Sequence, residues 1–149
     1  MKKNFLYLPP VFVFTSLFLI VIFYFVIPEF NFIPYPYNLV GIIISIAGFY
    51  LMSKAHYLFL KHKTTRMLRE SEAIITEGVF SFTRNPMYLG MFLLILGISV
   101  CFRNVFSIVA PFLFMLYINL IIIPHEETLM KKVFGDEYIS YKKRVRRWI

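Results

Sequence analysis

The sequence predicts an all-α integral membrane protein with four transmembrane helices and a cytoplasmic C-terminal interfacial helix. The 149 residues are 59% hydrophobic and only 16% charged, whereas soluble domains average about 45–50% apolar and about 25% charged residues. With 18 Phe and 10 Tyr, the chain has more apolar surface than a soluble core of this size can bury. This composition excludes an ordinary soluble enzyme, a disordered tail and a disulfide scaffold.

Four apolar segments approach the roughly 20 residues that a membrane helix needs. They cover about residues 8–27, 38–60, 87–102 and 105–123. The third segment is short, and the fourth has only Ser107 and Asn119 as clearly polar side chains. Since only Arg103 and Asn104 form a polar break between the last two segments, we predict that they make a tight antiparallel hairpin.

The basic residues lie on one side of these segments. Fourteen of the 16 precede the first segment, separate the second from the third, or follow the fourth. The positive-inside rule then places both termini and the 61–86 loop in the cytoplasm. The net charge of +8 is therefore a topology signal with attraction to anionic lipid, and we expect no nucleic-acid binding. The compact loops favour a prokaryotic inner membrane.

Polar and aromatic residues gather where the third segment begins. Pro86 suits the first turn of a helix, where its missing N–H costs nothing, and Asn85 before it is a good helix cap. The free N–H groups and positive dipole at such a helix start favour an anionic group. Arg84 and Tyr88 lie beside it, and Gly90 leaves room for close approach of a backbone or a ligand.

An acidic pair, Glu126-Glu127, follows the fourth segment. The predicted hairpin returns this pair to the side of Arg84 and Tyr88. Two adjacent carboxylates can bind ribose hydroxyls or an ammonium group, and an aromatic ring can face a cation such as a sulfonium. The sequence therefore predicts a zwitterionic, partly cationic ligand at the membrane surface. With a single cysteine and three isolated histidines, we expect no metal site.

The tail combines an apolar stripe with a basic face. The stripe consists of Phe134, Tyr138, Tyr141, Val145 and Trp148. The opposite face carries Lys142, Lys143, Arg146 and Arg147. Since the apolar residues recur at steps of three and four, we predict an interfacial helix on anionic lipid. Gly135 would break the preceding helix, and Asp136 can cap the new one.

In this order, these features resemble the isoprenylcysteine carboxyl methyltransferase family and the related phospholipid methyltransferases. The matching stretches are Gly78-Val79-Phe80, Arg84-Asn85-Pro86-Met87-Tyr88-Leu89-Gly90, Glu126-Glu127 and Phe134-Gly135-Asp136-Glu137-Tyr138. Lys63-Thr64-Thr65 also resembles the family's loop after the second span. The resemblance covers about residues 60–149, which we expect to form the cofactor-binding part of a single domain, 1–149.

The resemblance implies methyl transfer from S-adenosylmethionine to a lipid-like or prenylated acceptor that enters from the bilayer. It implies that Arg84 and Glu127 serve catalysis. The cofactor-binding residues would be Arg84, Asn85, Pro86, Tyr88, Gly90, His125, Glu126 and Glu127. An N-methyltransferase acting on a phospholipid amine and a noncatalytic membrane-assembly or lipid-binding protein are the alternatives.

The sequence departs from the family pattern at three places. Phe80 replaces the usual Tyr, Asn85 stands where many relatives have His, and residues 120–123 are all apolar. Eukaryotic carboxyl methyltransferases carry an Arg in this last stretch. Its absence weighs against a prenylcysteine-type carboxylate acceptor, unless Lys54, His56 or Arg66 supplies the cation.

Overall fold

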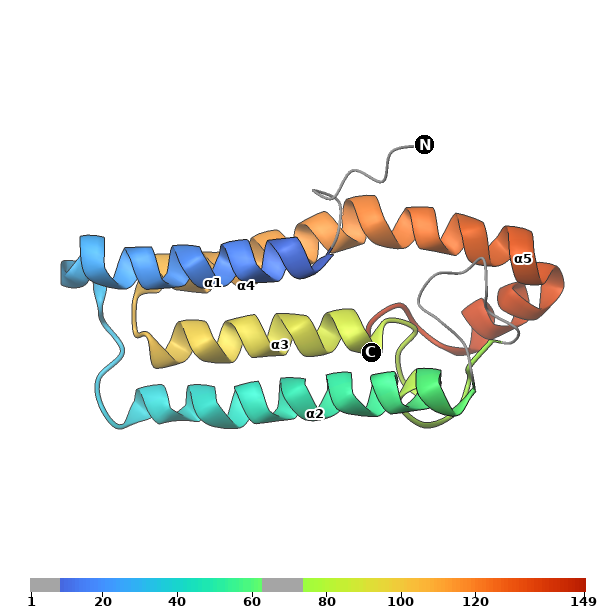
Figure 1. Cartoon of the computed structure of the whole chain (residues 1–149), viewed down its shortest axis with the longest axis horizontal. Coiled ribbons are helices and arrows are strands. Elements are labelled where there is room, and N and C mark those ends of the chain that lie inside the picture. Colours follow the sequence, from blue (N-terminus) through green and yellow to red (C-terminus); the bar gives the residue numbers. More distant parts are fainter. Residues whose placement is uncertain (1–8, 63–73) are drawn as a thin grey trace.

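The computed structural model describes residues 9–62 and 74–149 of the chain (Figure 1). Within these ranges every regular element is a helix. The α-helices are α1 (Pro9–Val26), α2 (Val40–Lys61), α3 (Pro86–Cys101), α4 (Val105–Tyr117) and α5 (Ile123–Arg144). The four predicted segments therefore form helices close to their predicted bounds. The fourth differs at its end, because the helix continues into α5.

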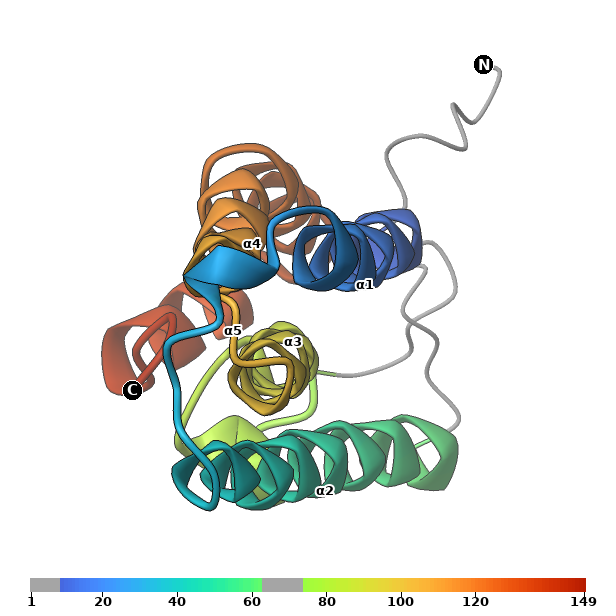
Figure 2. The same cartoon turned by 90° about the vertical axis from the view of Figure 1, so that its left-hand side faces the viewer.

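The four apolar helices form a bundle with α3 at its centre. Figure 2 shows α1 and α4 side by side, α2 on the opposite side, and α3 between them. The end of α2, the start of α3 and all of α5 lie at the same end of the bundle (Figure 1). This is the end that the positive-inside rule assigns to the cytoplasm.

Three helices in the described part of the chain are long and apolar enough to cross a membrane. They are Pro9–Val26, Tyr37–Lys61 and the continuous helix Val105–Arg144. The remaining apolar helix, α3, has 16 residues and is therefore about 24 Å long, shorter than the roughly 30 Å hydrocarbon core. Large apolar side chains cover the outside of the bundle, among them Phe14, Phe18 and Ile43 with 64–71% exposure. A protein with this surface is an integral membrane protein, since lipid chains cover such side chains at no cost.

Glycines let α2 and α3 pack with their backbones in contact. A Cβ added to Gly97 would overlap the carbonyl oxygen of Gly41. A Cβ added to Gly90 would lie 2.7 Å from the carbonyl oxygen of Gly48 and 2.5 Å from Cγ of Met52. Small residues allow such close helix approach in membranes. On the side where a Cβ would lie, the space that Gly90 leaves is filled by α2, which is the close approach of a backbone that we expected; its part in binding a cofactor stays a prediction.

The hairpin between α3 and α4 is confirmed, and buried Asn104 anchors it. Its Nδ2 lies 3.1 and 3.0 Å from the carbonyl oxygens of Phe23 and Ile27, and 3.0 Å from Oδ1 of Asn31. Its Oδ1 accepts a hydrogen bond from the backbone N–H of Phe106, 3.0 Å away. One side chain thus caps α4 and ties the end of α1 to the hairpin.

The helix continues past Ile123, the residue at which our predicted fourth segment ended. A π-helical turn (Ile118–Ile122) follows α4, and α5 continues the same helix. The wider π turn shifts the backbone hydrogen bonding by one residue, which accommodates a proline that has no N–H. The break predicted at Gly135 is confirmed, because its φ of 52° and ψ of −123° are not helical.

Candidate functional site

The end of the chain returns to the start of α3 and is bound there through its backbone. The backbone N–H of Arg84 donates to the carbonyl oxygen of Arg146, 3.1 Å away. The Thr83 hydroxyl and Asn85 Nδ2 both donate to the carbonyl oxygen of Arg147, each at 3.0 Å. The side chain of Asn85 does not cap α3, contrary to our expectation, because its amide donates to the tail instead.

Three cations surround the carboxylate of Glu127. Its oxygens lie 3.0 Å from Nη1 of Arg84, 2.7 Å from Nζ of Lys142 and 3.2 Å from Nε of Arg147. The side chains of Arg84 and Glu127 are only 9% and 12% exposed. The structure thus brings together Arg84 and Glu127, as the predicted hairpin required. A buried charge needs such a partner, because water no longer stabilises it.

The environment of Glu127 keeps its carboxyl group ionised. Burial by itself would raise the pKa, but hydrogen bonds from Lys142 and Arg147 and the charge of Arg84 outweigh burial and hold the pKa below its usual value. Burial raises the pKa of the neighbouring Tyr138 phenol, which therefore stays neutral and accepts a hydrogen bond from Nη1 of Arg84 at 3.1 Å. Glu127 is thus an anion that binds donors and cations at neutral pH.

The other acidic residue of the pair contacts α3. The hydroxyl of Tyr88 donates to Oε1 of Glu126 at 2.6 Å, and the ring of Tyr88 is buried. Pro86 is buried in the first turn of α3, as predicted. His125 is exposed, and no described contact brings it to this cluster. The structure therefore joins both glutamates to the start of α3 and leaves His125 outside.

The guanidinium of Arg84 is incompletely paired. Its Nε is buried and has no hydrogen-bond acceptor among residues 9–62 and 74–149. Leaving a buried donor unpaired costs about 1–3 kcal/mol, and more for a charged group. In addition, among residues 9–62 and 74–149 the cluster has three positive charges, on Arg84, Lys142 and Arg147, and two negative charges, on Glu126 and Glu127. The donor set therefore fits a ligand that brings a carboxylate or another acceptor.

Sequence reasoning missed Asn119 as part of this cluster. Its Oδ1 accepts a hydrogen bond from Nη1 of Arg147 at 3.0 Å. Asn119 lies within the π turn, Glu127 follows it by eight residues, and the wider turn accommodates one extra residue. They therefore lie on one face, as residues seven apart do in an α-helix. The polar side chain of Asn119 in an apolar segment was the available signal. Its partner, Arg147, comes from the far end of the chain and could not be foreseen.

The apolar stripe of the tail packs on the protein. Tyr138 and Tyr141 are buried and contact Ile74 in a small apolar cluster. The hydroxyl of Tyr141 donates to the carbonyl oxygen of Phe80 at 2.7 Å. Trp148 packs against the main core. The stripe thus shapes the site from the protein side. The helix is shorter than predicted, since it ends at Arg144 and Val145 is extended, and its contact with lipid stays a prediction.

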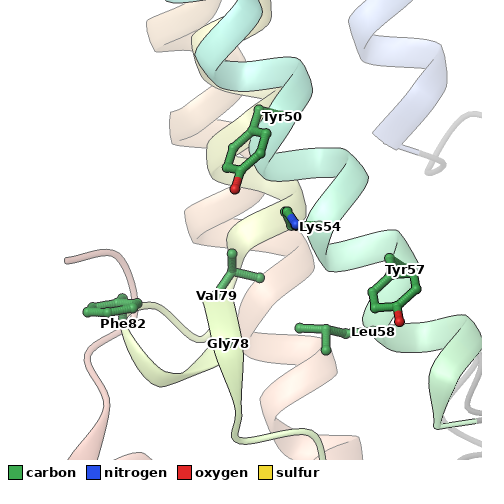
Figure 3. Close-up of a pocket in the computed structure, with 7 residues that line it drawn as sticks. All are labelled: Tyr50, Lys54, Tyr57, Leu58, Gly78, Val79 and Phe82. Atoms are coloured by element: carbon green, nitrogen blue, oxygen red, sulfur yellow. The ribbon is translucent and has the colours of Figure 1, made fainter.

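Lys54 and His56, two further candidate cations, have no described contact with this cluster. Lys54 lines a separate cleft beside α2 (Figure 3), and His56 is exposed on the same helix. Arg66 and the Lys63-Thr64-Thr65 stretch lie outside the described residues.

Comparison with known proteins places this arrangement in a family. A sequence model of the phospholipid methyltransferase family matches residues 35–137. An uncharacterized protein of Haemophilus influenzae is 40% identical over 63 residues, which are 42% of this chain and 100% of that protein. The protein-S-isoprenylcysteine O-methyltransferase B of Arabidopsis thaliana is 33% identical over 76 residues, which cover 51% of this chain and 39% of the relative.

A longer match extends over most of the chain. The probable protein-S-isoprenylcysteine O-methyltransferase of Oryza sativa subsp. indica is 29% identical over 121 residues, covering 78% of this chain and 61% of the relative. This chain thus spans less than two thirds of the length of these isoprenylcysteine methyltransferases. Because the family match covers well over half of the sequence, the chain belongs to the phospholipid methyltransferase family of membrane methyltransferases.

Proposed function

We propose that this membrane methyltransferase uses S-adenosylmethionine to methylate a lipid-like acceptor at the cytoplasmic face of the membrane. The family match and the names of the relatives support methyl transfer. The cofactor assignment rests on one observation, the buried Arg84 whose Nε lacks an acceptor in the described ranges. That donor lies beside Glu127, at the end of the bundle where α3 begins.

The residues around Arg84 fit the polar part of S-adenosylmethionine. Arg84 would bind the carboxylate of its amino-acid moiety, for which the excess positive charge of the cluster is suited. Glu126 and Glu127 would bind its ammonium group or ribose hydroxyls. When bound, the cofactor supplies a methyl group on a positively charged sulfur, open to attack by a nucleophile. The chain's own residues orient the two reactants and exclude water.

The roles of the remaining candidates follow from their contacts. Tyr88 would orient Glu126 through the hydrogen bond between its hydroxyl and Oε1. Asn85 and Pro86 would hold the tail and the start of α3 in place, since Asn85 donates to the carbonyl oxygen of Arg147. His125 has an exposed side chain, so its part in cofactor binding would require a ligand that extends to that surface.

Two acceptor classes follow from the comparisons. The relatives named isoprenylcysteine O-methyltransferases support a prenylated carboxylate. The description of the family supports a phospholipid amine, and residues 120–123 offer no cation that would bind a carboxylate. Labelled products separate the two classes, because base releases methanol from a methyl ester and leaves a methylamine intact.

Cofactor binding is testable with the purified protein in detergent. We expect saturable binding of S-adenosylmethionine by calorimetry, and loss of this binding in the Glu126→Gln/Glu127→Gln double variant. Glu29→Gln is the matched control, because Glu29 is exposed and lies at the opposite end of the bundle. Circular dichroism and gel filtration would show that each variant is folded. If the folded wild type fails to bind in detergent and in lipid nanodiscs, the proposal is wrong.

An acceptor screen then separates an enzyme from a lipid-binding relative. Membrane lipid extracts would be incubated with the protein and methyl-labelled cofactor, followed by separation of the labelled lipids. We expect label in one lipid class. Cofactor binding without any labelled product would favour the noncatalytic lipid-binding alternative.

A further inference from the structure

A cleft lies beside α2, and none of its lining residues belongs to the Arg84 cluster. The cleft has a volume of about 310 Å³ and is lined by Tyr50, Lys54, Tyr57, Leu58, Gly78, Val79 and Phe82 (Figure 3). One wall is α2, and the other is the short 3-10 helix Gly78–Ser81 together with Phe82. Its lining is mainly apolar and aromatic, with Lys54 as the single charged group among these residues.

Lys54 and Lys61 both lie in the second half of α2, but only Lys61 has an acidic partner among the described residues. Lys61 forms an ion pair with Glu77 at 2.7 Å. Among residues 9–62 and 74–149, no carboxylate lies within ion-pair distance of Lys54. Its Nζ lies instead 5.4 Å from the centre of the Tyr50 ring. The positive charge at the cleft is therefore not neutralised by any described acidic group.

The position of the cleft along α2 matches the level at which we expect lipid headgroups to meet hydrocarbon chains. Lys54 is seven residues before Lys61, the last residue of α2, which places it about 10 Å below that helix end. A lysine at this depth extends its ammonium group toward the headgroups. The neighbouring aromatic residues are strongly exposed, with Tyr50 at 60%, Tyr57 at 61% and Phe82 at 76%. Such side chains are typical of the membrane interface.

We propose that this cleft binds one anionic phospholipid, with the phosphate at Lys54 and an acyl chain along Val79 and Phe82. The unneutralised charge of Lys54 complements a phosphate, and the apolar wall complements a hydrocarbon chain. The 3-10 helix separates this lipid from the Arg84 cluster, since the carbonyl oxygen of its Phe80 accepts from Tyr141 on the other side. The proposal therefore does not depend on the cofactor assignment.

Native mass spectrometry of the detergent-purified protein tests this proposal. Phosphatidylglycerol and phosphatidylcholine would be added at equal concentrations, and the singly bound species compared. We expect the wild type to prefer phosphatidylglycerol about fivefold, the effect of one cation near a membrane surface. Lys54→Gln should remove this preference, and Lys54→Arg should keep it. Lys132→Gln, which removes an exposed lysine on α5, is the matched control and should keep it.

A second variant tests the apolar wall without changing charge. Phe82 is largely exposed, so Phe82→Ser should leave the fold intact and weaken binding of both lipids. The proposal is wrong if Lys54→Gln retains the preference, or if Lys132→Gln loses as much of it. It is also wrong if oleate binds more tightly than phosphatidylglycerol, since the cleft would then recognise a carboxylate.

Discussion

Replacing Glu127 with Gln removes the carboxylate shared by Arg84, Lys142 and Arg147 while keeping its size. The contact with Lys142, which is 48% exposed, contributes little, because exposed ion pairs are worth about 0–1 kcal/mol. The contact with Arg84 joins side chains only 9% and 12% exposed, and breaking a buried pair costs about 3–5 kcal/mol. Since Gln still accepts one hydrogen bond, we expect the lower end, about 3 kcal/mol.

A loss of about 3 kcal/mol lowers Tm by roughly 6–12 °C in a protein of this size. Thermal unfolding in detergent, followed by circular dichroism, measures this shift. The matched control is Glu77→Gln, which also removes a carboxylate paired with two neighbours, Lys61 and His62, but from a side chain that is 49% exposed. Its Tm should change far less. Equal, small shifts in both variants would show that burial of the Arg84–Glu127 pair does not stabilise the fold.

Three further predictions concern pH, helix packing and the tail. Because the pKa of Glu127 lies below its usual value, its contribution to stability is complete above about pH 4.5 and is lost as pH falls through the lowered pKa. Tm measured from pH 3 to 7 should therefore fall at the acid end in the wild type and less in Glu127→Gln. Gly97→Ala places a Cβ against the Gly41 carbonyl oxygen and should lower Tm strongly, whereas Ser53→Ala at an exposed position of α2 should leave Tm nearly unchanged. Asn119→Leu removes the acceptor of Arg147 Nη1 and should increase hydrogen exchange or proteolysis of the tail without loss of helix; an unchanged tail would contradict the role of Asn119.

Much of the fold could be predicted from the sequence because its signals are local. A long apolar run is a membrane helix wherever it lies, since an unpaired backbone is too costly in lipid. The hairpin at Asn104 and the break at Gly135 follow from residues at those positions. The hairpin in turn brings Arg84 and Glu127 to the same end of the bundle, which is why their proximity was predictable.

The features that the sequence did not reveal depend on partners distant along the chain. Gly90 is equally suited to a ligand or to a facing helix, and only the tertiary structure shows that α2 packs against it. Asn85 can accept from α3 or donate to a carbonyl oxygen, and the returning tail supplies that oxygen. The continuation past Pro124 depends on the π turn before it, which no residue pattern marked.

The tail shows this division most clearly. Its apolar stripe and basic face are evident in the sequence, as is the helix break that precedes them. Apolar side chains gain the same free energy against lipid or against protein, so the pattern could not say which surface they cover. Only the tertiary structure shows that Tyr138 and Tyr141 are buried beside Arg84 and Phe80, because the turn at Gly135 directs the chain back to the start of α3.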